Sequence, residues 1–152
     1  LSRLRFMKAK ELDKKFDVVM VGEILEHVSN PGLLFDNVRE HMKDDGIAII
    51  TTPNSLDYAA ILNVTFRGSS HINKDHMSWH NYATLTQLLG RHGLEIKDFY
   101  FLLDNNYRYD KKWKSIAMHM RYPILRAAAM FRREFSPHLL CVAQKKTSKN
   151  FI

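Results

Sequence analysis

The stretch FDVVMVGEILEHV, Phe16–Val28, and the later segment GIAIITTPN, Gly46–Asn54, decide the fold class of this chain. Residues 17–21 form a short, mostly apolar run that ends abruptly at Gly22, a pattern typical of a strand buried on both faces of a parallel sheet. Ligands of open α/β sheets bind beyond the carboxyl ends of the strands. We therefore expect the functional edge in the polar turn that follows Gly22.

The remaining apolar patterns predict three helices and two further strands. Pro31 suits the first turn of a helix, and Gly93 suits the end of one. The expected helices are Ser29–Lys43, Ser55–Phe66 and a segment capped by Asn81, and the further strands lie near 94–103 and 138–144. The polar loop Arg67–His80 lies between two of these helices and is where a substrate could sit.

Composition indicates one domain, or part of one, without membrane-spanning segments. The 152 residues are 45% hydrophobic, which is enough to bury a core. No apolar run approaches the roughly 20 residues of a membrane-spanning helix, and the N-terminus lacks the layout of a signal peptide. The single cysteine, Cys141, excludes an internal disulfide and lies in the apolar run LLCVA, where we expect a buried, inert thiol. These features predict a cytoplasmic protein.

The net charge of +7 is concentrated in the C-terminal third of the chain. Residues 105–152 hold 11 Lys and Arg against 2 Asp and Glu, whereas residues 1–104 hold 12 against 14. Basic and apolar side chains alternate through residues 108–133. Such a segment can pack its apolar face on the sheet, lie on an anionic membrane, grip a phosphate-bearing substrate or bind nucleic acid.

The combined pattern resembles the class I S-adenosylmethionine (SAM)-dependent methyltransferases, within the type 11/23 group that includes the ubiquinone-biosynthesis O-methyltransferases. The residues that carry the resemblance are Phe16, Asp17, Val18, Val19, Glu23, Leu25, Glu26, His27, Val28, Pro31, Gly46, Thr51, Thr52, Pro53 and Asn54. The resemblance extends over about residues 12–145 and corresponds to the second half of the family's domain. It implies an α/β, Rossmann-like sheet with parallel strands near 16–22, 46–52 and 94–103, a variable insert at 104–136 and a final antiparallel strand near 138–144.

The glycine-rich turn of the family's first strand has no counterpart in this sequence. The six glycines nowhere fall in the spacing G-x-G-x-x-G, and the chain begins with Leu1. We therefore expect residues 1–146 to form a partial methyltransferase domain that lacks the cofactor-binding first half, followed by a tail at 147–152. Removing half a sheet would leave one strand with an unpaired edge, through which two copies could dimerise.

The resemblance also implies residues for cofactor and metal binding. It places Gly22, flanked by Glu23 and Ile24, against the methionine part of SAM. If Glu23 opens a helix, Glu23, Glu26 and His27 stand at i, i+3 and i+4 on one face and could hold Mg²⁺ or another divalent cation. This set is similar to the E-x-x-E-H ligands of some ubiquinone-pathway methyltransferases and of small-RNA 2′-O-methyltransferases.

The Asp-His pair that supplies a fourth ligand in the small-RNA enzymes could correspond to Asp75 and His76 in this chain. In relatives that show no metal dependence, the Glu at this turn accepts backbone hydrogen bonds and the His packs beneath the cofactor. Both interpretations stay open at the level of sequence.

His76 and His71 are the candidate general bases, since an imidazole can accept a hydroxyl proton near neutral pH. Trp79 and Tyr82 could form one wall of the acceptor pocket or anchor the loop to the core. The sequence thus predicts a SAM-dependent methyltransferase that methylates a hydroxyl of a small molecule, a sugar or a lipid-linked acceptor. The alternatives are an RNA 2′-O-methyltransferase and a truncated, non-catalytic binding module.

Overall fold

The computed structural model describes residues 14–68, 74–103, 127 and 131–147. Several regions named in the sequence analysis lie outside this part of the chain. They are His71, all but four residues of the basic segment 108–133, most of the predicted insert 104–136 and the end of the predicted tail. Predictions about those segments therefore stay predictions.

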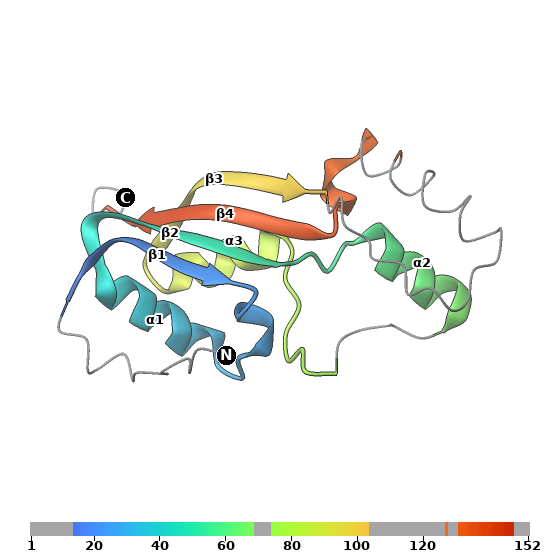
Figure 1. The fold of residues 1–152 in the computed structure, drawn as a ribbon, viewed down its shortest axis with the longest axis horizontal. Helices are drawn as coiled ribbons and strands as arrows, with labels where there is room; N and C mark the ends of the chain where they lie inside the picture. The colour runs from blue at the N-terminus through green and yellow to red at the C-terminus, as the bar shows by residue number, and fades with distance from the viewer. Residues whose placement is uncertain (1–13, 69–73, 104–126, 128–130, 148–152) are drawn as a thin grey trace, which may run out of the picture.

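A four-stranded sheet in the order β1-β2-β4-β3 forms the centre of the fold (Figure 1). Its strands are β1 (Phe16–Gly22), β2 (Met42–Pro53), β3 (Leu94–Leu102) and β4 (His138–Lys145). β1 pairs in parallel with β2, while β4 lies between β2 and β3 and runs antiparallel to both. β1, β2 and β3 thus point the same way, and the predicted arrangement of three parallel strands with a final antiparallel one is confirmed.

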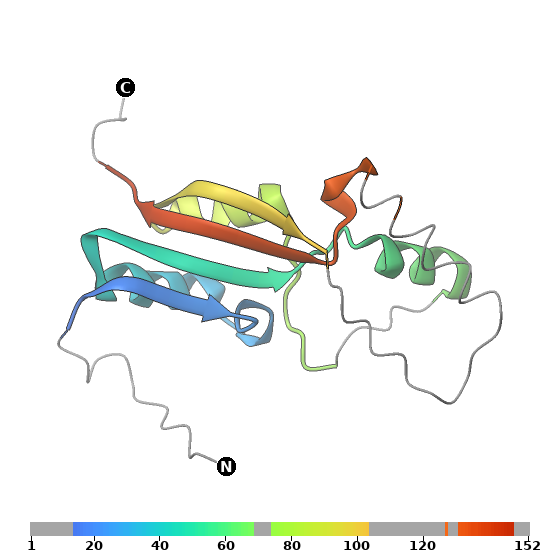
Figure 2. The ribbon, with the colours of Figure 1, turned by 45° about the horizontal axis from the view of Figure 1, so that its top comes forward.

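The helices are α1 (Pro31–His41), α2 (Tyr58–Arg67) and α3 (Tyr82–Arg91), with short 3₁₀ helices η2 (Leu25–His27) and η3 (Arg133–Phe135). Figures 1 and 2 show α1 and α3 against the same face of the sheet, whereas α2 extends beyond the carboxyl end of β2. The predicted cap at Asn81 is confirmed, and Asn30 caps α1. The Asn30 side chain accepts from the Leu33 amide, and Asn81 and Thr84 form a reciprocal capping box.

The core lies between the sheet and helices α1 and α3. Alternate residues of β2 and β4 face the helices and are fully buried, which includes Ala48, Ile50 and Cys141. Their neighbours on the opposite face, such as Ile49, are only half-buried. Cys141 is confirmed as a buried thiol, and burial raises its pKa to about 12.

β1 lies at one edge of the sheet and is buried on one face only, which corrects the prediction that both of its faces are buried. Val18 is 49% exposed and Met20 is 71% exposed, whereas Val21 on the other face is 3% exposed. Within the described residues, α1 covers only one face of the strand, and no strand pairs with its outer edge. An apolar run predicted the strand correctly but could not reveal how many layers cover it.

The first helix and the second strand meet earlier than predicted. α1 ends at His41, and β2 begins at the fully buried Met42, which pairs with Phe16. The three polar residues that follow are exposed, so the hydrophobic pattern placed the start of the strand at Gly46. Close approach explains that glycine, because a Cβ atom there would lie 2.9 Å from the Phe16 carbonyl oxygen. Among the described helices, none is both long enough and apolar enough to cross a membrane.

Candidate functional site

The turn after β1 is tighter than a helix start. Glu23 adopts a φ of 48°, in the left-handed region, and its amide donates to the Thr51 carbonyl oxygen over 3.0 Å. Its carboxylate lies 3.6 Å from Nδ1 of His138 at the start of β4. The helix begins only at Leu25, so the condition under which Glu23 would share one helical face with Glu26 and His27 is not met.

Glu26 is a buried acid at the centre of the site. It is 2% exposed, and the Thr52 hydroxyl donates to its Oε2 over 3.1 Å. Its backbone carbonyl accepts from the amides of Met77 and Ser78 over 2.6 and 3.3 Å. These bonds join η2 to the loop that precedes α3, although more than 50 residues separate them in sequence. The loop segment that lines the site is thereby held at the carboxyl ends of β1 and β2.

Glu26, His27 and His76 form a cluster of metal-ligating side chains. One ligand atom from each lies within 4.8 Å of the others, and the His27 and His76 rings meet edge to face with centroids 4.8 Å apart. Three of the four predicted metal ligands therefore come together. The backbone of Glu23 turns away before η2 begins, and this residue is not part of the cluster.

The hydrogen bond of His27 fixes its tautomer. Its Nδ1 lies 3.2 Å from the Asp75 carbonyl oxygen, which can only accept, so Nδ1 carries the proton. In the neutral imidazole Nε2 is the nitrogen with the lone pair, and it lies 3.9 Å from Oε1 of Glu26. This arrangement is usual for metal-binding histidines, whose second nitrogen donates to an oxygen that orients the ring. One carboxylate and two imidazoles suit Zn²⁺ or Mn²⁺ as donors, and the chemistry of the set fits a divalent cation.

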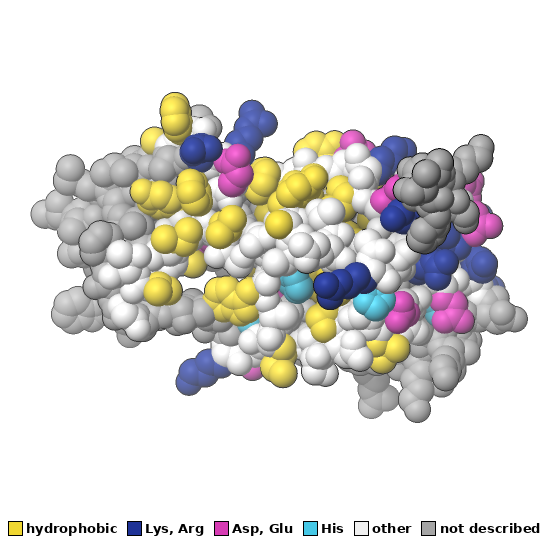
Figure 3. All heavy atoms as spheres, turned by 180° about the vertical axis from the view of Figure 1, so that it is seen from behind, with side chains coloured by type: hydrophobic (Ala, Val, Ile, Leu, Met, Phe, Trp, Pro, Cys, Tyr) yellow, Lys and Arg dark blue, Asp and Glu magenta, His cyan; other side chains and the backbone are white. Residues whose placement is uncertain are grey.

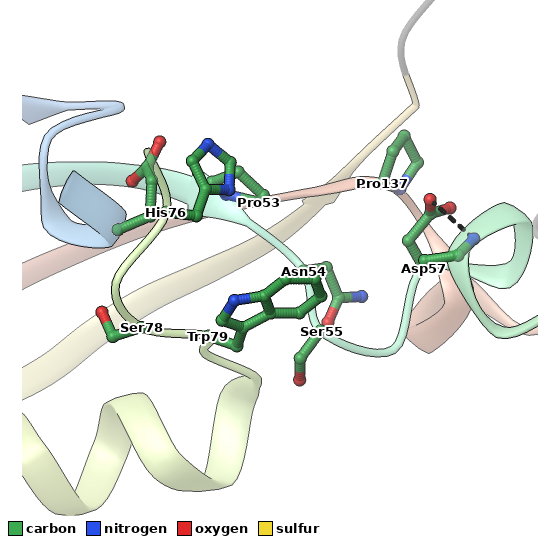
Figure 4. A pocket seen from close by; sticks show the side chains of 10 residues that line it. Pro53, Asn54, Ser55, Asp57, His76, Ser78, Trp79 and Pro137 are labelled. Carbon is green, nitrogen blue, oxygen red and sulfur yellow. Dashed lines mark hydrogen bonds between the residues drawn. The ribbon is translucent and has the colours of Figure 1, made fainter. Parts of the chain in front are cut away.

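A pocket of about 130 Å³ opens beside this cluster, at the carboxyl end of β2 (Figure 4). Trp79 and Pro53 supply apolar surface, and His76 and Glu26, which lie in one cluster, supply polar groups. The full lining is Glu26, Pro53, Asn54, Ser55, Asp57, Ala60, His76, Ser78, Trp79 and Pro137. Tyr82 is not among these residues, because its ring packs edge to face on Phe99 of β3.

His80 anchors the loop that carries His76 and Trp79. It is 7% exposed, its carbonyl accepts from the Ser55 amide over 2.8 Å, and its Nε2 lies 3.0 Å from the Ser78 hydroxyl. Since that hydroxyl donates to the Leu25 carbonyl, Nε2 of His80 is the donor in their contact. Burial lowers the pKa of His80, against the opposing influence of the nearby Glu26 carboxylate. A neutral His80 therefore serves as a structural anchor.

Asn54 is a site residue whose role was not predicted from the sequence. It is 4% exposed, and its side-chain amide donates to the carbonyl oxygens of Glu134 and Ser136 over 2.7 and 2.8 Å. Its Oδ1 accepts from the Leu56 amide over 3.0 Å. This side chain joins the end of β2 to the segment before β4 and to the approach of α2. The TTPN sequence was part of the family pattern, but nothing in it indicated the two distant partners, Glu134 and Ser136.

The sequence matches known methyltransferases. A family model described as "Methyltransferase domain" matches residues 3–98. The ubiquinone biosynthesis O-methyltransferase of Rickettsia canadensis is 33% identical over 97 residues, which cover 57% of this chain and 39% of that protein. The corresponding enzyme of Rickettsia prowazekii is 41% identical over 54 residues, which cover 36% and 21%. The matches thus span about two fifths or less of the length of these relatives.

Solved methyltransferase structures share the fold. A SAM-dependent methyltransferase from Archaeoglobus fulgidus superimposes with a TM-score of 0.56 at 21% identity, over 90% of this chain and 63% of that one. Magnesium protoporphyrin IX methyltransferase from Synechocystis, solved with bound SAH, gives a TM-score of 0.52 at 12% identity, over 93% and 49%. The family match over most of the sequence, together with this sheet order, shows that the chain belongs to the SAM-dependent methyltransferases.

Proposed function

We propose that this chain holds the acceptor for methyl transfer from SAM to a hydroxyl group, on a small molecule, a sugar or a lipid-linked compound. The pocket beside Glu26 and His76 is the observation that supports this function. It lies beyond the carboxyl ends of two parallel strands, where α/β folds bind ligands. Its apolar wall at Trp79 can hold the body of an acceptor, while the polar end receives the hydroxyl.

The turn after β1 fits the methionine end of SAM. Gly22 is exposed and has no side chain, so a ligand can approach its backbone closely, and Glu23 and Ile24 flank it. When bound, SAM supplies an already activated methyl group. The protein then has to align the acceptor oxygen with that group and remove one proton.

His76 is our candidate for the group that takes the proton of the acceptor hydroxyl. It lines the pocket and belongs to the cluster with Glu26 and His27. His71, the second candidate, lies outside the described residues. Glu26, His27 and His76 would together hold a divalent cation, which supplies Lewis acidity that lowers the pKa of a bound hydroxyl. With a cation bound, His76 would act as a metal ligand in place of its role as proton acceptor. Glu26 would keep the hydrogen bond from Thr52.

Methyl transfer from labelled SAM to a panel of acceptors tests the proposed function. The panel holds a catechol, a simple sugar, a polyprenylated phenol and an RNA oligonucleotide. We expect label in a hydroxylated small molecule or lipid-linked acceptor, and a loss of about 10²–10⁴-fold in rate for His76→Gln. Label in RNA alone would establish the RNA 2′-O-methyltransferase instead. If the folded chain neither binds SAM nor transfers label, the enzymatic proposal fails for these 152 residues.

Titration with Mn²⁺, followed by calorimetry, tests the cation separately from the activity. Glu26→Gln should abolish binding, because it removes the anionic ligand of the cluster. Glu23→Gln is the matched control, since Glu23 is an acid of the same turn that is not part of the cluster. Equal binding by both variants would show that the cluster is not the cation site.

A further inference from the structure

Apolar side chains of α2 and of Leu56, two residues before the helix begins, face solvent. Leu56, Ile61 and Val64 are 40%, 37% and 52% exposed. Phe131, which lies just before η3, is 89% exposed. We call these four residues the α2 surface. Figure 3 shows apolar side chains gathered over the end of the molecule that holds α2, with Lys and Arg side chains bordering them.

η3 and α2 are neighbours, so the arginines at η3 lie near the apolar residues of α2. Phe135 packs edge to face on Tyr58, with ring centroids 5.7 Å apart, and Asn54 bonds the Glu134 carbonyl. Arg132 and Arg133 are both exposed, and neither forms an ion pair within the described residues.

Acidic groups near this end are few. The sequence of α2, YAAILNVTFR, contains no Asp or Glu. Asp57 precedes the helix, and its carboxylate accepts from the Ala60 amide over 3.2 Å. Glu134 is the one acidic residue in 131–147. Among the described residues at this end, Arg132 and Arg133 are thus the exposed cations beside the α2 surface, against Asp57 and Glu134, and the sequence of residues 105–152 as a whole has a balance of +9.

We infer that this end of the molecule docks on an anionic lipid bilayer. The α2 surface enters the boundary between headgroups and acyl chains, and Arg132 and Arg133 pair with lipid phosphates. An apolar helical face bordered by arginines binds such a surface through both burial of apolar area and electrostatic attraction. A soluble protein partner of α2 would require a complementary apolar groove, but would not draw on the net positive charge of this third of the chain.

The pocket lies at the same end, which gives the docking a consequence for the substrate. Ser55, Asp57 and Ala60, at the start of α2, line the pocket. A bilayer held against α2 therefore lies next to the pocket, and the acceptor would be a lipid-linked compound that enters from the membrane. This consequence for the substrate depends on the proposed methyltransferase function, whereas the docking itself does not.

Vesicle flotation of the full chain tests the docking without SAM or acceptor. The vesicles contain phosphatidylcholine alone or phosphatidylcholine mixed with phosphatidylglycerol. We expect flotation with the mixed vesicles only. Release is expected when salt rises from about 0.1 M to about 1 M, because the Debye length falls from roughly 10 Å to roughly 3 Å.

Substitutions at the α2 surface provide the second arm. Ile61→Gln with Val64→Gln should reduce partitioning by roughly tenfold for each side chain replaced, on the scale of apolar transfer free energies. Leu33→Gln is the matched control, because Leu33 is 58% exposed on α1, an element that contributes nothing to the α2 surface or the pocket. Arg132→Gln with Arg133→Gln should remove the preference for phosphatidylglycerol. This charge variant leaves the apolar residues in place, so it tests the docking even if the first pair unfolds the chain.

Several results would overturn the inference. The first is that the chain does not float although its circular dichroism shows that it is folded. The second is that Leu33→Gln reduces partitioning as much as the pair at Ile61 and Val64. The third is that the preference for phosphatidylglycerol persists after both arginines are replaced. Tight binding of an RNA oligonucleotide without vesicle binding would identify the basic end as a nucleic-acid surface instead. If the chain floats but never transfers methyl groups, the proposed function fails and the docking stands.

Discussion

Replacing Asn54 by aspartate tests whether this residue holds the pocket together. The change is nearly isosteric, so it leaves the packing of the site intact. It removes both amide protons, which now reach the carbonyl oxygens of Glu134 and Ser136 at 2.7 and 2.8 Å. The new carboxylate oxygen would instead face two carbonyl oxygens at hydrogen-bonding distance, where their dipoles oppose a negative charge.

The expected loss of stability follows from these two contacts. A buried acceptor left without its donor costs about 1–3 kcal/mol, and the Glu134 carbonyl is less deeply buried than that of Ser136, so we expect a total of about 2–4 kcal/mol. In a chain of this size each kcal/mol corresponds to roughly 2–4 °C, so the melting temperature should fall by roughly 5–15 °C. The carbonyl dipoles also raise the pKa of the introduced carboxyl, because they disfavour its charged form. The deficit should therefore shrink as the pH falls from about 7 to about 4.

Urea denaturation and thermal melting of Asn54→Asp and the wild type provide the assay, with Asn37→Asp as control. The Asn37 amide also donates to a carbonyl, that of Leu33 at 2.6 Å, but at an exposed position where water replaces the lost partner. We expect less than about 1 kcal/mol for the control. A similar small loss for both variants, or a deficit of Asn54→Asp that does not change with pH, would refute the role given to Asn54.

Three further predictions concern other described residues. Cys141, with its pKa raised to about 12 by burial, should react with a thiol reagent at about pH 8 only after denaturant unfolds the chain; rapid labelling of the native protein would contradict its burial. His80 has a folded-state pKa below its usual 6.5, so unfolding takes up a proton and the wild type should lose stability as pH falls below about 6.5. His80→Phe should flatten that loss in melting curves taken at about pH 7 and about pH 5, and an unchanged slope would assign the dependence to other groups. Gly93→Ala should lower the free energy of unfolding by about 1 kcal/mol, because Gly93 has a φ of 70°. Gly90→Ala lies inside α3 with open space around it and should raise the free energy of unfolding by about 0.5–1 kcal/mol. Changes of the same sign for both variants in urea denaturation would contradict this reasoning.

The local sequence was sufficient for the elements whose signals are local. Three local signals each predicted an element that the structure contains. They are the apolar run at residues 16–22, the helix spacing after Pro31 and the cap at Asn81. These signals depend on side-chain periodicity and on hydrogen bonds between residues three or four apart, so a short window holds them completely. The parallel and antiparallel pairing of the sheet came from the family resemblance, since no local pattern specifies which strand lies beside which.

The site was predictable only in part, for a geometric reason. Glu26 and His27 are neighbours in sequence, and His76 came into the prediction through the resemblance to metal-dependent relatives. Spacing alone suggested that Glu23 would join them, but the left-handed turn at Glu23 shifts the start of η2 and takes its side chain away from the cluster.

The sequence by itself determined the family, the strand–turn–helix unit at 16–41 and the residue types available for chemistry at the carboxyl edge of the sheet. The tertiary structure alone decided which of them meet. It buried Glu26 under Thr52, brought His76 to His27 and made Asn54 the link to the segment before β4. These contacts join residues 26 to 82 positions apart, where strand pairing and burial of apolar faces set the distances and no local periodicity can encode them.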